Sequence, residues 1–443
     1  MQRRGWTRRG LLGGGLASAW LWRGGLLLPA GCVDRQTDGG VDPDGGLAIP
    51  PPTTPVAVQK GPWMTVTGTG SARLRFETAE DVRLPVRVLL PDGTARWYEP
   101  IRTTSTLQYA RDTSRINEGR DPADVFPPDL AGPATLHDVD LTDLPALGEI
   151  GWEVHVGGDV VMTGTYRPPH GTTATRRLAW MSDTMTPVEK RLHGVFAAFG
   201  PDVLVHGGDC TYADAVTDTW NGLFAAARPL LSVAALHGVL GNHDGDLPFE
   251  QTDMWDRLFA GQGDARGTRE HAFTLGSARV IVLDSETEGL TSARQLDFLT
   301  AELDRVDEDA DLHRAIVAFH RPLLTLSKYW DDRENERDFD TMHDLFRSRN
   351  VGLVLAGHAH SFEHFAVEGV HYVVDGGGGA LLYDPDEEYD RAAASRPDLV
   401  ATRTVASRSY GGLMIDVQPD GVVRLQRLQT EDGTTLMSLT LPA

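Results

Sequence analysis

The sequence contains little cysteine. Its two cysteines, Cys32 and Cys210, are too few for a disulfide framework. Hydrophobic residues make up 41% of the 443 residues, which is ordinary for a globular protein and enough for a sizeable core. Length alone indicates roughly two to three domains.

Positive charge is also scarce. The chain has 41 lysines and arginines against 63 aspartates and glutamates, so its formal net charge is -22. Because phosphate backbones attract basic surfaces, this balance argues against nucleic acid as a partner. It would also repel anionic substrates unless a local positive site, such as a pair of metal ions, captures them.

A long hydrophobic run is missing as well. The apolar region at 11–22 is interrupted by Arg23 and is too short for a comfortable membrane span of about 20 residues. The segment TRRGLL at 7–12 resembles a twin-arginine export signal, and LPAGC at 28–32 resembles a bacterial lipoprotein box.

From these segments we expect a signal peptide over 1–31, lipidation of Cys32 and a flexible linker over 32–55. The protein would then be an exported lipoprotein of a bacterium, periplasmic or on the cell surface, and would touch a membrane only through its signal or lipid anchor. A plain cleaved signal or an uncleaved anchor is the alternative. The sequence does not indicate an oligomeric state.

Two patterns divide the rest of the chain. From 56 to 168, apolar and polar residues alternate with a period of two between turn signals, which predicts a small all-β sandwich. From 174 to 443, short apolar strands alternate with helical stretches, and hairpins with turns at 419–421 and 431–433 follow. The helices are expected at 187–199, 215–231, 291–306 and 339–348.

Five apolar runs in the second part end in residue types that bind metals. The residues at these exits are Asp183, Asp209 with Tyr212, Asn242 with His243, His320, and the pair His358 and His360. Ligands in open α/β sheets bind outside the carboxyl ends of the strands, so we expect these side chains to converge. The Gly-His-Ala-His segment at 357–360 is central, because imidazoles two residues apart in an extended segment face the same way.

These motifs resemble those of the calcineurin-like metallophosphoesterases and, within that superfamily, of the purple acid phosphatases. Four motifs are intact, namely Gly-Asp-x-x-Tyr at 208–212, Gly-Asn-His-Asp at 241–244, Val-x-x-His at 317–320 and Gly-His-x-His at 357–360. The first motif keeps Asp183 and loses its glycines, and Met185 stands where other metallophosphoesterases carry a ligand histidine. Tyr212 stands where the purple enzymes supply their substitute ligand.

The resemblance covers roughly 174–443 and implies an α/β metallophosphoesterase fold, in which two β-sheets flanked by helices form an αββα sandwich. The all-β domain before it resembles, more weakly, the accessory domain of plant-type members, and we expect a fibronectin- or immunoglobulin-like sandwich there. The catalytic domain would therefore follow a small N-terminal domain.

The resemblance also implies two metal ions. The first, typically Fe(III), would be held by Asp183, Tyr212 and His360. The second, a divalent zinc, manganese or iron, would be held by Asn242, His320 and His358. Asp209 would bridge them. Independently, carboxylate and phenolate oxygens suit a hard trivalent ion, whereas imidazoles and an amide oxygen suit a borderline divalent one.

The implied activity is hydrolysis of phosphate monoesters by attack of a metal-bound hydroxide, as in an acid phosphatase. His243 would bind the substrate or protonate the leaving oxygen, and Asp244 would orient His243. Two alternatives remain, an exported phosphodiesterase or nucleotidase with another metal pair, and a surface-anchored binding protein whose metal site is vestigial.

Several residues near these motifs have weaker interpretations. We expect Cys210 to be a small packing residue, and His206 to be either a core histidine or a support for the ligands. The glycines at 376–379 predict a tight loop near the metals, and the acidic residues at 384–390 a solvated loop. Arg321 and His364 could alter substrate preference in a way that the sequence does not specify.

Overall fold

The computed structural model describes residues 56–105, 134–185, 187–212, 217–245, 252–267, 269–330 and 333–443. These residues belong to one compact unit, Pro51–Ala443. The expected signal peptide, Cys32, the linker to residue 55 and residues 106–133 lie outside the described residues. Of the helices that the structure describes, none is long and apolar enough to cross a membrane.

The first large sheet carries parallel strands at its centre. Its order is β22-β21-β20-β9-β10-β11-β1-β2-β6-β5. The parallel strands are β9 (Arg176–Met181), β10 (Val203–His206) and β11 (Ala235–Gly238). Antiparallel to β9 follow the hairpin strands β20 (Gly411–Val417), β21 (Val423–Gln429) and β22 (Thr435–Leu441), so both predicted hairpin turns are confirmed.

The second large sheet has the order β12-β13-β14-β15-β16-β18-β17-β19. Four of its strands run parallel, β14 (Ala278–Val282), β15 (Arg314–Ala318), β16 (Val351–Ala356) and β18 (Val370–Asp375). The others are β12 (Ala265–Arg266), β13 (His271–Leu275), β17 (Phe362–Val367) and β19 (Arg403–Ser407).

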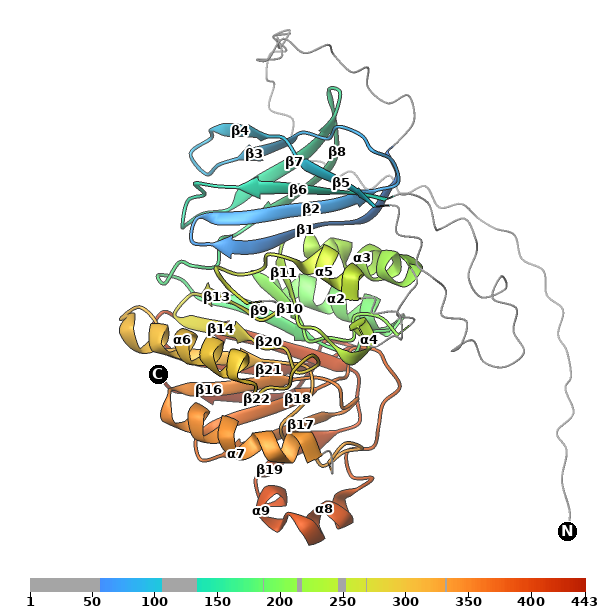
Figure 1. Cartoon of the computed structure of the whole chain (residues 1–443). Coiled ribbons are helices and arrows are strands. Elements are labelled where there is room, and N and C mark those ends of the chain that lie inside the picture. Colours follow the sequence, from blue (N-terminus) through green and yellow to red (C-terminus); the bar gives the residue numbers. More distant parts are fainter. Residues whose placement is uncertain are drawn as a thin grey trace, which may run out of the picture. The chain divides into compact units, whose positions relative to one another are not determined.

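Helices cover the outer faces of both sheets (Figure 1). On the first sheet lie α2 (Val188–Phe199), α3 (Thr217–Leu231) and α5 (Thr252–Phe259). On the second lie α6 (Ala293–Glu308) and α7 (Arg333–Ser348). The short helices are α4 (Asn242–Gly245), α8 (Tyr389–Ser395) and α9 (Pro397–Val400).

A buried apolar layer joins the two sheets. Trp180 of the first sheet and Ile316 and Leu355 of the second belong to one core cluster and are at most 1% exposed. Burial of apolar area on this scale is the main stabilising contribution to such a fold. The layer order of helices, sheet, sheet and helices agrees with the expected αββα sandwich.

The predicted helices are confirmed with small differences at their ends. Gly200 ends α2 in a left-handed conformation, with φ of 62°, as a helix C-cap glycine does. Ser292 caps α6, since its side chain accepts a hydrogen bond from the backbone N–H of Gln295. The helix α7 begins six residues before the predicted start at Phe339, because its first turns are polar and carry no apolar periodicity.

The elements described between 56 and 168 are all strands. They are β1 (Val58–Gly68), β2 (Ser71–Thr78), β3 (Val86–Leu89), β4 (Ala95–Tyr98), β5 (Ile101–Ser105), β6 (Ala134–Leu141), β7 (Ile150–Val156) and β8 (Asp159–Tyr166). A four-stranded sheet, β4-β3-β7-β8, stands beside the β1-β2-β6-β5 end of the first large sheet. Phe76 and Trp152, one from each, share the buried cluster between them.

Four of the N-terminal strands, β1, β2, β6 and β5, continue the first large sheet. Met64 of β1 pairs with Ala235 of β11 in parallel register. The indole of Trp63 lies 4.5 Å from the ring of Phe224 in α3, measured between ring centroids. The division of the chain into a domain at 56–168 and a second at 174–443 stays a prediction.

Candidate metal centre

The expected ligands come together in the loops that follow the carboxyl ends of the strands. The residues at these exits are Asp183 after β9, Asp209 after β10, Asn242 after β11, His320 after β15, and His358 and His360 after β16. Three of them have a left-handed backbone, with φ of 59° at Asp183, 50° at Asp209 and 66° at His358. Such a conformation is costly for a residue with a side chain and is typical of functional sites.

The first group of side chains surrounds the Asp183 carboxylate. Tyr212 donates its hydroxyl hydrogen to Oδ1 of Asp183 at 2.9 Å, and Nε2 of His360 lies 3.3 Å from the same oxygen. Ser182 Oγ and the backbone N–H of His358 donate to Oδ2 at 2.7 and 2.8 Å. Four groups from three chain segments therefore fix this carboxylate in place.

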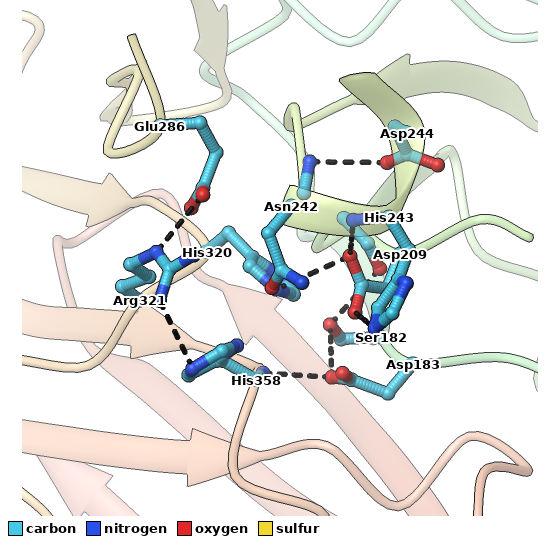
Figure 2. A network of polar contacts seen from close by, with 12 residues as sticks. Ser182, Asp183, Asp209, Asn242, His243, Asp244, Glu286, His320, Arg321 and His358 are labelled. Atoms are coloured by element: carbon cyan, nitrogen blue, oxygen red, sulfur yellow. Dashed lines mark hydrogen bonds and ion pairs between the residues drawn. The ribbon is translucent and has the colours of Figure 1, made fainter. Parts of the chain in front are cut away.

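The second group surrounds the Asp209 carboxylate. Nε2 of His320 lies 3.4 Å from Oδ1 of Asp209 and 3.2 Å from Oδ1 of Asn242. Figure 2 shows Asp183, Asp209, Asn242 and His358 turned toward one another. The structure thus places all seven expected ligands at one end of the two sheets.

The ring orientations of two histidines suit metal binding. Nδ1 of His320 lies 2.9 Å from the carbonyl oxygen of Gly207, and Nδ1 of His360 lies 2.9 Å from that of Leu381. A carbonyl oxygen only accepts, so each Nδ1 carries a proton, and in the neutral ring Nε2 presents a lone pair. Each Nε2 faces a carboxylate oxygen, Asp209 Oδ1 at 3.4 Å for His320 and Asp183 Oδ1 at 3.3 Å for His360. A cation bound between the two would take the place of the proton that Nε2 otherwise donates to the carboxylate.

Burial makes the charges in this site depend on one another. Burial alone would raise the pKa of Asp183, but a hydrogen bond from His360 and the charge of His320 lower it to about 2. Burial alone would lower the pKa of His320, but Asp209 and Asp183 raise it to about 10. Burial and the charge of Asp183 raise the pKa of Tyr212, so its hydroxyl stays protonated unless a cation is bound beside it.

His243 and Asp244 differ in their surroundings. The His243 side chain is 32% exposed, and its Nε2 lies 4.0 Å from Oδ2 of Asp209. Asp244 is buried, and its two oxygens accept hydrogen bonds from the backbone N–H groups of Cys210 at 2.8 Å and Gly241 at 3.0 Å. Asp244 therefore ties the loops after β10 and β11 together, and its part in orienting His243 stays a prediction.

A partly buried ion pair beside the site lies outside the sequence motifs. Arg321 Nε donates to Oε2 of Glu286 at 2.9 Å, and Arg321 Nη1 lies 3.3 Å from Nε2 of His358 (Figure 2). Glu286 follows the end of β14, the strand next to β15. Applying the strand-exit argument to β14 could have found it, although no motif marks the position.

Two tyrosines stack on the candidate ligand histidines, and they also lie outside the sequence motifs. The ring of Tyr329 stacks on His358 with centroids 4.2 Å apart, and that of Tyr383 stacks on His360 at 4.4 Å. No spacing in the sequence predicts these contacts, because loops set them.

Cys210 and His206 lie behind the ligands. Cys210 is buried in an apolar cluster, with its Sγ 3.2 Å from Nδ1 of His206, which agrees with a packing role. Nε2 of His206 lies 3.0 Å from Oγ1 of Thr184, so His206 links the residues that follow Asp183 and Asp209.

Two further segments were singled out in the sequence. The loop at 376–379 lies beside Asp183, since the N–H of Gly378 donates to the carbonyl of Ser182 at 3.0 Å. His364 pairs with His371 across β17 and β18, where the ring nitrogens lie 3.0 Å apart. This pair is formed within the second sheet, and a link between His364 and substrate preference stays a prediction.

Comparison with known proteins finds a family that is similar to the part of the chain that carries this site. Residues 176–362 match the model of the calcineurin-like phosphoesterase family. "Probable inactive purple acid phosphatase 9" of Arabidopsis thaliana is 25% identical over 195 residues, which cover 37% of this chain and 30% of the relative. "Probable cyclic nucleotide phosphodiesterase" of Rhodococcus erythropolis is 29% identical over 185 residues, which cover 40% of this chain and 58% of the relative.

A solved structure shares the fold over most of the chain. The purple acid phosphatase PPD1 from yellow lupin (Lupinus luteus) seeds superposes with a TM-score of 0.70 at 16% identity, covering 88% of this chain and 75% of that one. The described residues also hold two groups of possible metal ligands, as the family would require. Residues 176–362 therefore match the calcineurin-like phosphoesterases, and the chain shares the fold of the lupin protein.

Proposed function

We propose that the chain is a binuclear-metal phosphoesterase that hydrolyses phosphate monoesters. The observation that carries the proposal is the position of Asp209, where two groups of possible ligands meet. The groups are Asp209 with His320 and His358, and Asp209 with Asp183 and His360. In each group the ligand atoms lie within 4.8 Å of one another, which suits a carboxylate that bridges two ions.

The donor chemistry differs between the two sides. Asp183, Tyr212 and His360 would hold Fe(III), because two anionic oxygens suit a hard trivalent ion. Asn242, His320 and His358 would hold a divalent zinc, manganese or iron. When bound, the ions would supply Lewis acidity, a lowered pKa for a nearby water, and positive charge that attracts phosphate to an acidic chain.

The chain's own residues would handle the proton. In the hydrolysis, a water oxygen bonds to phosphorus, the bond from phosphorus to the leaving oxygen breaks, and that oxygen takes up a proton. His243 is suited to deliver this proton or to bind a phosphate oxygen, because it is partly exposed and lies beside Asp209. Arg321 would remain oriented by Glu286 at the edge of the site.

Two other functions follow from the relatives. The Rhodococcus protein is named as a phosphodiesterase, which keeps diester hydrolysis open as a second candidate. The Arabidopsis protein is named as inactive, which keeps open a binding protein whose metal site does no chemistry.

One experiment separates these functions. The metal-loaded protein is assayed with 4-nitrophenyl phosphate and with bis(4-nitrophenyl) phosphate. We expect turnover of the monoester, and a loss on the order of 100-fold or more in Asp209→Asn, since even outer-shell changes at metal sites cost up to this much. Faster turnover of the diester would favour the second candidate, and unchanged activity of Asp209→Asn would overturn the proposal.

Asp416→Asn is the matched control. Asp416 carries the same side chain and pairs with Arg177 near the start of β9, whereas Asp183 follows the end of that strand. The same substitution there should leave turnover unchanged.

We also propose that the protein is exported and lipidated at Cys32. The twin-arginine and lipobox-like segments at 7–12 and 28–32 support this. Expression of the full chain and of Cys32→Ser, followed by fractionation, tests it. Membrane-bound wild type and soluble Cys32→Ser are expected, whereas the same distribution for both would exclude a lipid anchor at this position.

A further inference from the structure

A lysine is held at the edge of the candidate metal centre by the two tyrosines that back the ligand histidines. The ammonium of Lys328 lies 4.5 Å from the ring centroid of Tyr383 and 5.5 Å from that of Tyr329. The tyrosine hydroxyls lie 3.5 Å apart, so the rings form one support. Cation–π attraction of this kind places a flexible side chain without neutralising its charge.

Lysine is rare in this chain, and the two lysines other than Lys328 lie in other parts of the fold. The sequence has three, Lys60, Lys190 and Lys328. Lys60 is fully buried in an ion pair with Glu77, and Lys190 lies on α2. Lys328 is exposed, and in the described part of the chain no carboxylate lies within salt-bridge distance of it.

The neighbouring cation is in a different situation. Arg321 is the other positive side chain in the same loop after β15, but its guanidinium is paired with Glu286. Among the described residues, Lys328 therefore adds positive charge to this edge of the site, whereas Arg321 with Glu286 adds none.

Lys328 is close enough to act on a bound substrate. Since Tyr383 lies 4.4 Å from His360 and 4.5 Å from the ammonium, the ammonium is no more than about 9 Å from the His360 ring, within the ~10 Å screening length at 0.1 M salt. A phosphate held between the ligand groups would leave its ester group to extend outward. A second anionic group on that ester could then reach the ammonium.

We propose that Lys328, supported by Tyr329 and Tyr383, binds a second anionic group of the substrate. The preferred substrates are then phosphate esters that carry a further phosphate, rather than simple monoesters. This inference rests on the proposed phosphoesterase function. On a chain of net charge -22, Lys328 would supply local positive charge beside the site for such an anionic group.

The test uses competing ligands that differ by one phosphate. Turnover of 4-nitrophenyl phosphate by the metal-loaded protein is inhibited with fructose 1,6-bisphosphate and with fructose 6-phosphate. In the wild type we expect the bisphosphate to bind about tenfold more tightly, a difference that one charge-assisted contact can supply. In Lys328→Met the ratio should fall to about twofold, and in Lys328→Arg it should be retained.

The control removes a positive charge elsewhere. Arg424 is exposed on β21 opposite Asp416, which pairs with Arg177 near the start of β9. Arg424→Met should keep the wild-type ratio. The preference in the wild type should also weaken as salt rises, which a purely structural role of Lys328 would not produce.

The outcomes are distinct. An equal ratio in wild type and Lys328→Met, or no preference for the bisphosphate in the wild type, would overturn the subsite while leaving the phosphoesterase intact. No turnover of 4-nitrophenyl phosphate would instead overturn the proposed function on which the subsite rests.

Discussion

Gly357→Ala should damage the metal centre through a single methyl group. A Cβ at position 357 would lie 1.9 Å from Oγ of Ser182 and 2.7 Å from Oδ2 of Asp183. Ordinary contacts begin near 3.4 Å, so the serine hydroxyl must move by more than an ångström. Ser182 Oγ donates to Asp183 and lies 3.0 Å from the carbonyl of Gly207, and it has no free space to enter without losing these bonds.

The magnitude follows from these contacts. Overpacking a dense interior costs about 1–3 kcal/mol, and a lost hydrogen bond to a charged group costs about 1.5–3 kcal/mol. We therefore expect a loss of about 2–5 kcal/mol in the free energy of unfolding, and at least about tenfold weaker metal binding because Asp183 is displaced.

Gly352→Ala is the matched control, because Gly352 lies in β16, the strand that Gly357 directly follows. Its added Cβ would meet Nη1 of Arg314 at 2.9 Å, the end of a flexible side chain that can shift. Chemical unfolding and metal titration of both variants provide the assay. If Gly357→Ala binds metal and unfolds like Gly352→Ala, the tight approach of residue 357 to Asp183 is not what shapes the site.

Two further predictions concern stability. Arg427 makes a two-pronged ion pair with Asp375, 3.1 and 3.2 Å long and fully buried, so Arg427→Met should cost about 3–5 kcal/mol in chemical unfolding, and a loss below about 1 kcal/mol would contradict this. His193 is buried, and burial and His206 lower its pKa from 6.5 to about 3. Below pH 6.5 the His193 imidazole therefore binds a proton in the unfolded chain but stays neutral in the folded chain. The free energy of unfolding falls as the pH falls from 6.5 toward 3. In urea unfolding, the free energy of unfolding of His193→Leu minus that of the wild type should be about 2 kcal/mol more favourable at pH 5 than at pH 7.5. The same difference at both pH values would contradict this reasoning.

The convergence of the candidate ligands could be predicted because it follows a local rule. Each expected ligand comes directly after an apolar run, and parallel strands place their exits at one edge. The helices could be predicted because apolar residues recur at helical spacing, and α7 was predicted too short where its first turns are polar.

Long-range pairing could not be predicted in the same way. Alternation identifies a strand, but it does not say which strand lies beside it, so the parallel pairing of β1 with β11 had no signal in the sequence. The sequence therefore did not indicate that the strands β1, β2, β6 and β5 continue the first large sheet.

The contacts around the candidate ligands also could not be predicted from the sequence. Tyr329 and Tyr383 come from different loops, and their stacking on His358 and His360 depends on how those loops fold. The Asp244 carboxylate accepts backbone hydrogen bonds from Cys210 and Gly241, which no motif predicts, and its expected part in orienting His243 stays a prediction.

The most direct test of the metal centre is a visible absorption spectrum of the aerobically purified protein, with metal analysis of the same sample. We predict two metal ions per chain, one of them iron, and a broad visible band that disappears in Tyr212→Phe. A colourless protein with two zinc or manganese ions would contradict the iron–tyrosinate assignment. A protein that holds no metal after loading has been attempted would contradict the binuclear centre itself.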